Sequence, residues 1–226
     1  MRGRADALDR ALAIAGAVLV LAALAIIWGA RGTIDRVVYV SGLGAAGMPT
    51  AGWFMAALLC VAAGGALIAW VARGIRARVR ILGLWLPAVS LGAASLCFLV
   101  ASQVTCTAGC PLPIQPGFFS LQDLVHISFA VLAFALACWA MLQCAAALDR
   151  PVLARLSLGA AVAVAAIAGA GGLMSVFGFH REVGAWLEYA ATSIGLLWVA
   201  VLGLATAFRQ PAEELAAQGE EQLVGE

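Results

Sequence analysis

The sequence predicts an all-α integral membrane protein in which six transmembrane helices form one bundle. Hydrophobic residues make up 64% of the 226 residues and charged residues 11%, whereas soluble domains carry about 25% charged residues. No formal charge occurs between Arg80 and Asp123. Each uncharged run can hold at least one span of roughly 20 residues, the length that crosses a ~30 Å hydrocarbon core. These runs cover residues 11–30, 37–72, 81–122, 124–148, 156–179 and 189–208.

We expect the six helices to lie within these runs, with Pro87 kinking the third. The first apolar run is longer than the 7–15 residues of a signal-peptide core, so it is expected to be a retained span. Residues 1–208 then form one transmembrane domain, and residues 209–226 form an acidic, disordered cytoplasmic tail. The expected helices are 10–30, 51–72, 81–102, 123–148, 153–175 and 184–208.

The distribution of arginine predicts which side of the membrane each end of the bundle faces. Short cytoplasmic loops carry an excess of basic residues. If both termini are cytoplasmic, the inner side holds ten arginines and the outer side holds Arg31, Arg36 and Arg181. We therefore expect a multi-pass protein of the cell membrane with cytoplasmic N- and C-termini. The ten inner arginines are Arg2, Arg4, Arg10, Arg73, Arg76, Arg78, Arg80, Arg150, Arg155 and Arg209.

Ionisable and polar side chains beside the spans gather at the predicted outer side. Such groups are costly near lipid and are functional candidates. We expect them to line an outward-facing polar pocket. The candidates are Asp35, Ser41, Asp123, His126, His180 and Glu188.

Each candidate also has a structural interpretation. Asp123 and His126 share a helix face, so they can form an acid–base pair, or Asp123 can cap the helix while His126 is a satisfied polar group. His180 can be a solvated loop residue. Glu188 can form a structural ion pair with Arg31, Arg36, Arg181 or His126, or it can be a functional carboxylate. The histidine and carboxylate spacing matches no metal motif, so we assign no metal. The sequence indicates no particular cofactor, and we commit to no catalytic residue.

The cysteines divide into a loop pair and four residues inside spans. Cys106 and Cys110 lie four residues apart in the predicted outer loop between the third and fourth helices. An oxidising exterior favours a disulfide between them, with a metal or redox role as the alternative. The other four are expected to pack as small apolar residues.

Three segments carry a resemblance to a known family. They are residues 39–49, residues 117–126 and residues 184–189. With them the chain resembles the bacterial family of six-helix membrane proteins catalogued as domain of unknown function nine-nine-eight. Gly42 and Tyr189 depart from the family pattern, which usually has an acidic residue and an arginine there. The resemblance implies the fold, membrane location and an outer-face cluster, but no activity. The matching residues are Ser41, Leu43, Gly44, His126 and Glu188.

We expect the outward-facing pocket to bind or move a lipid headgroup or small amphiphile. One alternative is a membrane-embedded hydrolase or transferase at the outer leaflet, with Asp123 and His126 as acid and base and Glu188 as orienting group or metal ligand. Another is an accessory subunit that forms homo- or hetero-oligomers through small-residue helix faces, such as Gly64–Gly65 and Gly169–Gly172. Membrane lipids are the expected partners. Nucleic acid is not, because the sequence predicts no basic, aromatic-rich surface.

Overall fold

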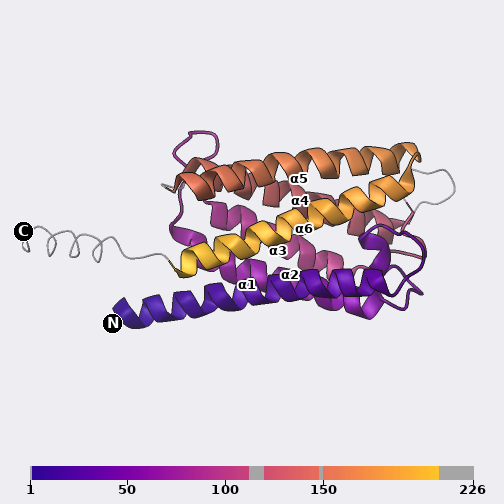
Figure 1. Ribbon diagram of the computed structural model, residues 1–226, viewed down its shortest axis with the longest axis horizontal. Coiled ribbons are helices and arrows are strands. Elements are labelled where there is room, and N and C mark those ends of the chain that lie inside the picture. Colours follow the sequence, from indigo (N-terminus) through magenta and orange to yellow (C-terminus); the bar gives the residue numbers. More distant parts are fainter. Residues whose placement is uncertain (1, 112–119, 148–149, 209–226) are drawn as a thin grey trace, which may run out of the picture.

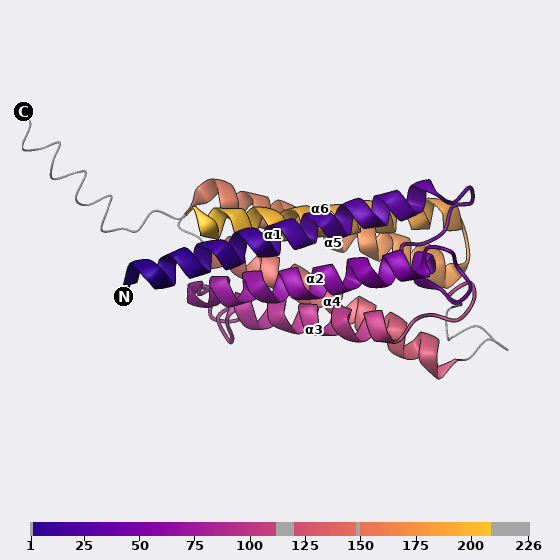
Figure 2. The same cartoon turned by 90° about the horizontal axis from the view of Figure 1, so that it is seen from below.

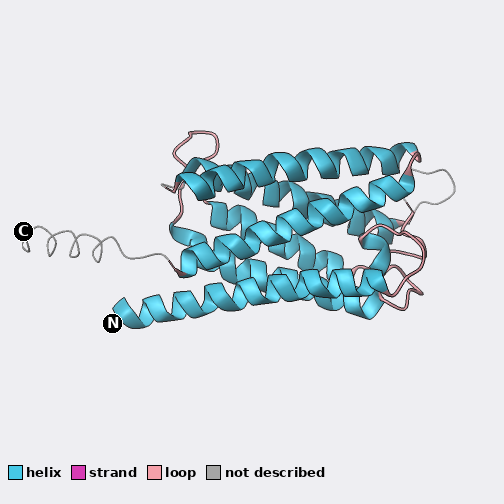
Figure 3. Cartoon of the chain, in the orientation of Figure 1, coloured by secondary structure: helices cyan, strands magenta, loops and turns pink. Residues whose placement is uncertain are grey.

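The computed structural model describes residues 2–111, 120–147 and 150–208, and within these it contains helices and no strands (Figure 3). The predicted all-α fold is therefore confirmed. Six α-helices are connected by loops and two short 3-10 helices, η1 (Ser41–Gly44) and η2 (Ala72–Gly74). The α-helices are α1 (Arg2–Gly32), α2 (Ala51–Val71), α3 (Pro87–Gln103), α4 (Leu121–Ala147), α5 (Pro151–Phe177) and α6 (Arg181–Ala207).

The helices form a closed ring in chain order. Each helix packs against its sequence neighbours, α6 closes the ring by packing against α1, and α2 also touches α6. Figures 1 and 2 show α1 beginning and α6 ending at the same end of the bundle. At this end, Arg10 Nε donates a hydrogen bond to the carbonyl oxygen of Ala207, at 3.1 Å. We call it the terminal end, and we call the opposite end, with the α1–α2, α3–α4 and α5–α6 connections, the distal end.

Five of the described helices are long and apolar enough to cross a membrane, namely α1, α2, α4, α5 and α6. Large apolar side chains are exposed around the bundle, including Val131 at 62% and Val162 at 60%. Soluble monomers rarely expose apolar patches of more than a few hundred Å². The fold is thus consistent with a multi-pass membrane protein.

The third helix differs from its prediction. It begins at Pro87 rather than at residue 81, and its 17 residues make it the shortest α-helix described. Pro87 lies in the first turn, where proline's fixed φ and missing N–H cost nothing, so it begins the helix and does not kink it. The other α-helices lie within a few residues of their expected ranges, except that α1 begins earlier, at Arg2. The predicted tail, residues 209–226, lies outside the described residues.

Small residues let the helices approach closely, as expected for two of the glycine positions. A Cβ added to Gly64 of α2 would lie 2.7 Å from the carbonyl oxygen of Gly16 in α1. A Cβ on Gly171 of α5 would lie 3.1 Å from the carbonyl oxygen of Gly184 in α6. By contrast, Gly169 has open space around its Cβ position. Gly64 and Gly171 therefore each allow the backbones of two helices to approach closely.

Substitution of Gly64 by alanine is expected to destabilise the protein by about 1–3 kcal/mol, because the new methyl group must push α1 away from α2. Gly169→Ala makes the same chemical change where nothing lies within 4 Å. That control should be neutral or slightly stabilising, since alanine favours helix more than glycine does. Denaturant unfolding of both variants in detergent micelles measures the difference. Equal midpoints would show that the α1–α2 approach is not tight.

The centre of the ring is apolar. All six helices line a cavity of about 50 Å³ that exposes almost no polar surface. Phe98 of α3 and Phe134 of α4 meet edge-to-face beside it, with ring centroids 6.1 Å apart. The polar side chains predicted to be functional do not line this cavity. They lie instead at the distal end.

Candidate functional site

The structure divides the six predicted site residues into three groups. Asp123 and His126 bond to the α3–α4 connection, whereas Glu188 reaches the α1–α2 connection beside Ser41. Asp35 and His180 are exposed, and neither side chain makes a hydrogen bond within the described part of the chain. The His180 ring packs edge-on against the neighbouring Phe179 ring, with centroids 5.8 Å apart.

Asp123 holds the disulfide loop in place. Its side chain is completely buried, and its two carboxylate oxygens accept hydrogen bonds from the backbone N–H and the hydroxyl of Thr107, each at 2.7 Å. Thr107 lies between Cys106 and Cys110, which form the predicted disulfide. Asp123 therefore holds the described segment that follows α3, at Thr107.

His126 stabilises the end of α3. Its imidazole is 3% exposed, and Nδ1 lies 2.6 Å from the carbonyl oxygen of Val104 and 3.1 Å from that of Ala101. Both partners are acceptors, so Nδ1 carries the proton. The last carbonyls of a helix lack partners within it, and His126 supplies one. No hydrogen bond joins His126 to Asp123 among the described residues; His126 bonds to Ala101 and Val104, whereas Asp123 bonds to Thr107.

Glu188 bonds to the backbone that leads into η1. Its Oε2 accepts a hydrogen bond from the Val40 N–H at 2.9 Å, and the Ser41 backbone adds a second. No cation forms an ion pair with Glu188 in the part of the chain that the structure describes. The alternative of a structural ion pair with Arg31, Arg36, Arg181 or His126 is therefore wrong. Instead, backbone donors compensate this partly buried carboxylate.

Aromatic rings and a guanidinium group cluster near the start of α6, the segment that also carries Glu188. The Trp28 ring stacks on Trp186 with centroids 6.3 Å apart, and both pack against Tyr189, at 5.4 and 5.8 Å. The Arg31 guanidinium carbon lies 5.0 Å from the Trp186 ring centroid. Tyr189 is within electrostatic reach of both Arg31 and Glu188. We call this cluster the distal corner; its members are Trp28, Arg31, Tyr39, Trp186, Glu188 and Tyr189.

Three polar atoms in the distal corner are buried and have no hydrogen-bond partner within residues 2–111, 120–147 and 150–208. They are Arg31 Nε and the hydroxyl oxygens of Tyr39 and Tyr189. Tyr189 is only 1% exposed. Tyr39 fits beside Gly184 because glycine has no side chain: a Cβ added to Gly184 would lie 2.5 Å from the Tyr39 hydroxyl oxygen. Buried polar groups in folded proteins are nearly always paired with protein, water or a ligand. The corner therefore has unused capacity to bind a polar group.

The distal corner and the Asp123–His126 pair are separate. The α4 helix packs against α3 and α5, whereas α6 packs against α5, α1 and α2. Among the described residues, no three histidine, cysteine, aspartate or glutamate side chains gather as a metal site requires. The arrangement suits recognition of a polar group at the corner rather than shared acid–base chemistry.

Sequence reasoning missed most of the distal corner. Neither Trp28 nor Trp186 is among the predicted site residues, and Tyr189 was noted only as a departure from a family pattern. One signal was available, because Trp186, Glu188 and Tyr189 lie within one turn at the start of the last helix. Arg31 and Tyr39 could be added only from the packing of α1 against α6.

The chain matches no protein-family model, no curated protein and no solved structure. The resemblance to the six-helix family therefore stays a prediction.

Proposed function

We propose that this protein spans the cell membrane six times and binds a lipid headgroup or small amphiphile in the distal corner, which faces the outside. The observation that carries the proposal is a set of buried atoms in the distal corner that have no hydrogen-bond partner among the described residues, namely Arg31 Nε and the Tyr39 and Tyr189 hydroxyls. A buried polar atom that has lost its hydration and gained no partner costs free energy. A headgroup that brings both acceptors and donors would pair them.

The chemistry of the corner suits a headgroup with both charge signs. Arg31 can bind a phosphate or carboxylate, and the two phenol hydroxyls can donate to the same anion. Glu188 can accept hydrogen bonds from an amine or hydroxyl. Trp28 and Trp186 are 43% and 44% exposed, so their rings are available to the interface, where indoles are favoured. A zwitterionic headgroup on two acyl chains combines these features.

The membrane placement rests on the exposed apolar surface and on the arginine distribution. In this placement the terminal end, with its basic α2–α3 connection, faces the cytoplasm. The distal corner then lies at the outer headgroup level. The α3 helix is counted as a span in addition to the five long apolar helices, although it is shorter than they are.

Tyr189→Phe tests the proposal with little risk to packing, because it removes only the unpartnered hydroxyl. Binding of short-chain phosphatidylethanolamine to the detergent-solubilised protein is measured by native mass spectrometry. We expect about 5-fold weaker binding, which corresponds to one lost hydrogen bond. Glu188→Gln should weaken the binding of phosphatidylethanolamine more than the binding of phosphatidylcholine, because the quaternary amine of phosphatidylcholine donates no hydrogen bond.

Asp35→Asn is the matched control, since it neutralises an exposed distal carboxylate outside the corner. It should leave both affinities unchanged. Unaltered binding by Tyr189→Phe and Glu188→Gln, with both variants folded, would rule out the distal corner as the site.

A further inference from the structure

The α2–α3 connection completes a span that α3 alone is too short to make. Seventeen residues rise about 26 Å, less than the ~30 Å of a bilayer's hydrocarbon core. The residues just before Pro87 include four exposed apolar side chains, Val79 (51%), Ile81 (67%), Leu84 (70%) and Trp85 (43%). If α3 crosses the membrane, these side chains enter the leaflet at the terminal end. The arginines that precede and interrupt them then lie at headgroup level.

This connection is folded, because α4 satisfies its backbone. Non-helical backbone is tolerated at membrane depth only where protein or water pairs its polar groups. Gln143 of α4, which is fully buried, donates from Nε2 to the carbonyl oxygens of Leu82 and Trp85, at 2.9 and 2.8 Å. Ser90 donates to Gln143 Oε1 at 2.7 Å and accepts from Trp85 Nε1 at 2.6 Å. The exposed residues are thus presented on a fixed turn.

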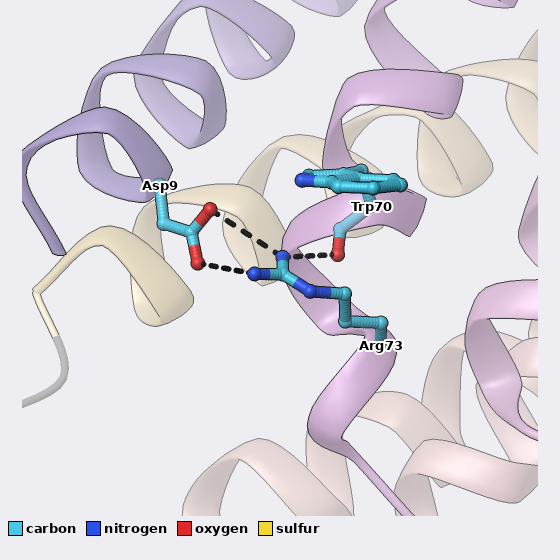
Figure 4. A network of polar contacts seen from close by, with 3 residues as sticks. All are labelled: Asp9, Trp70 and Arg73. Carbon is cyan, nitrogen blue, oxygen red and sulfur yellow. Dashed lines mark hydrogen bonds and ion pairs between the residues drawn. The ribbon is translucent and has the colours of Figure 1, made fainter. Parts of the chain in front are cut away.

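Not every arginine of the connection is available for a ligand. Arg73 is held by Asp9 of α1, with a shortest distance of 2.9 Å, by the Trp70 carbonyl oxygen at 2.8 Å and by the Trp70 ring (Figure 4). Arg76 and Arg80 are exposed, and neither has a hydrogen bond or ion pair in the described ranges. Arg76 and Arg80 flank Val79 in the sequence.

We propose that Arg76 and Arg80, together with the apolar residues of the same turn, form a binding site for anionic phospholipids at the terminal end. Guanidinium groups bind phosphate oxygens in a bidentate manner, and the exposed Val79, Ile81 and Leu84 side chains contact the acyl chains beneath. A lipid with net negative charge gains more from two cations than a zwitterionic lipid does. The inference rests on membrane placement and not on the distal corner.

The test compares short-chain phosphatidylglycerol with phosphatidylcholine by native mass spectrometry of the full-length protein. We expect the wild type to bind phosphatidylglycerol more tightly. The double variant Arg76→Gln/Arg80→Gln should weaken the binding of phosphatidylglycerol about 25-fold, because each arginine is expected to contribute about 5-fold. The binding of phosphatidylcholine should weaken far less. Inorganic phosphate at the same concentration should not compete.

Arg36→Gln/Arg181→Gln is the control, because it removes the same charge from exposed positions at the distal end. It should change phosphatidylglycerol binding less than twofold. If both double variants lost phosphatidylglycerol binding equally, the loss would be explained by net charge alone, and the proposed site would be overturned. Unchanged binding in Arg76→Gln/Arg80→Gln, or full competition by inorganic phosphate, would also overturn it. Phosphatidylethanolamine binding that depends on Tyr189 should persist in Arg76→Gln/Arg80→Gln, which separates this site from the distal corner.

Discussion

Asp123→Ala is expected to destabilise the protein by about 3–5 kcal/mol. The carboxylate is completely buried and accepts two hydrogen bonds of 2.7 Å from Thr107. Hydrogen bonds to a carboxylate contribute about 1.5–3 kcal/mol each, and the Thr107 N–H would lose its partner. Denaturant unfolding in mixed micelles, with the Cys106–Cys110 disulfide intact in all samples, measures the change in unfolding free energy.

Asp123→Asn separates the two contributions, because its single side-chain oxygen can accept only from one Thr107 donor at full strength. It should lose about half as much stability as the alanine variant. Leu121→Ala, at a position that is 66% exposed in the same turn, should change stability by less than about 1 kcal/mol. If Asp123→Ala were as mild as Leu121→Ala, the carboxylate would not be what holds the loop.

Gln143→Leu is expected to cost about 2–4 kcal/mol although leucine nearly matches glutamine in volume. The substitution removes both donors to the Leu82 and Trp85 carbonyls and the acceptor for the Ser90 hydroxyl. Each buried group left without a partner costs about 1–3 kcal/mol, and part of that cost is recovered by relaxation of the turn. The same unfolding measurement reports the loss.

The matched control is Gln103→Leu, which makes the same chemical change at the distal end of α3, where the side chain is exposed. Its effect should stay below about 0.5 kcal/mol. A similar loss for both variants would mean that Gln143 does not support the α2–α3 connection. Gln143→Leu should also weaken phosphatidylglycerol binding, because the turn that carries Arg76 and Arg80 would no longer be fixed.

The uncharged runs were sufficient to predict the number and approximate position of the helices, because each span must bury its backbone within a nearly continuous apolar segment. The start of α3 was not predictable in the same way. Pro87 is compatible with either a kink or a first turn, and the choice depends on Gln143, which lies 56 residues away in the chain and pairs the carbonyls that precede the proline.

The sequence also placed the candidate polar residues together at one end of the bundle, and the structure has them there. It could not divide them into groups, because that depends on the order of helices around the ring. Asp123 and His126 bond to the α3–α4 connection, whereas Glu188 faces the segment after α1 because α6 closes the ring against it. Tyr39 and Arg31 join the corner only through this closure.

The proposed function depends most directly on which side of the membrane the distal end faces. Single cysteines introduced at exposed positions, Asp35→Cys at the distal end and Gly74→Cys at the terminal end, can be treated in intact cells with a membrane-impermeant maleimide. The unsubstituted protein supplies the background from its own cysteines. We predict labelling of the Asp35→Cys variant from outside, and labelling of the Gly74→Cys variant only after permeabilisation. The reverse pattern would contradict an outward-facing headgroup site.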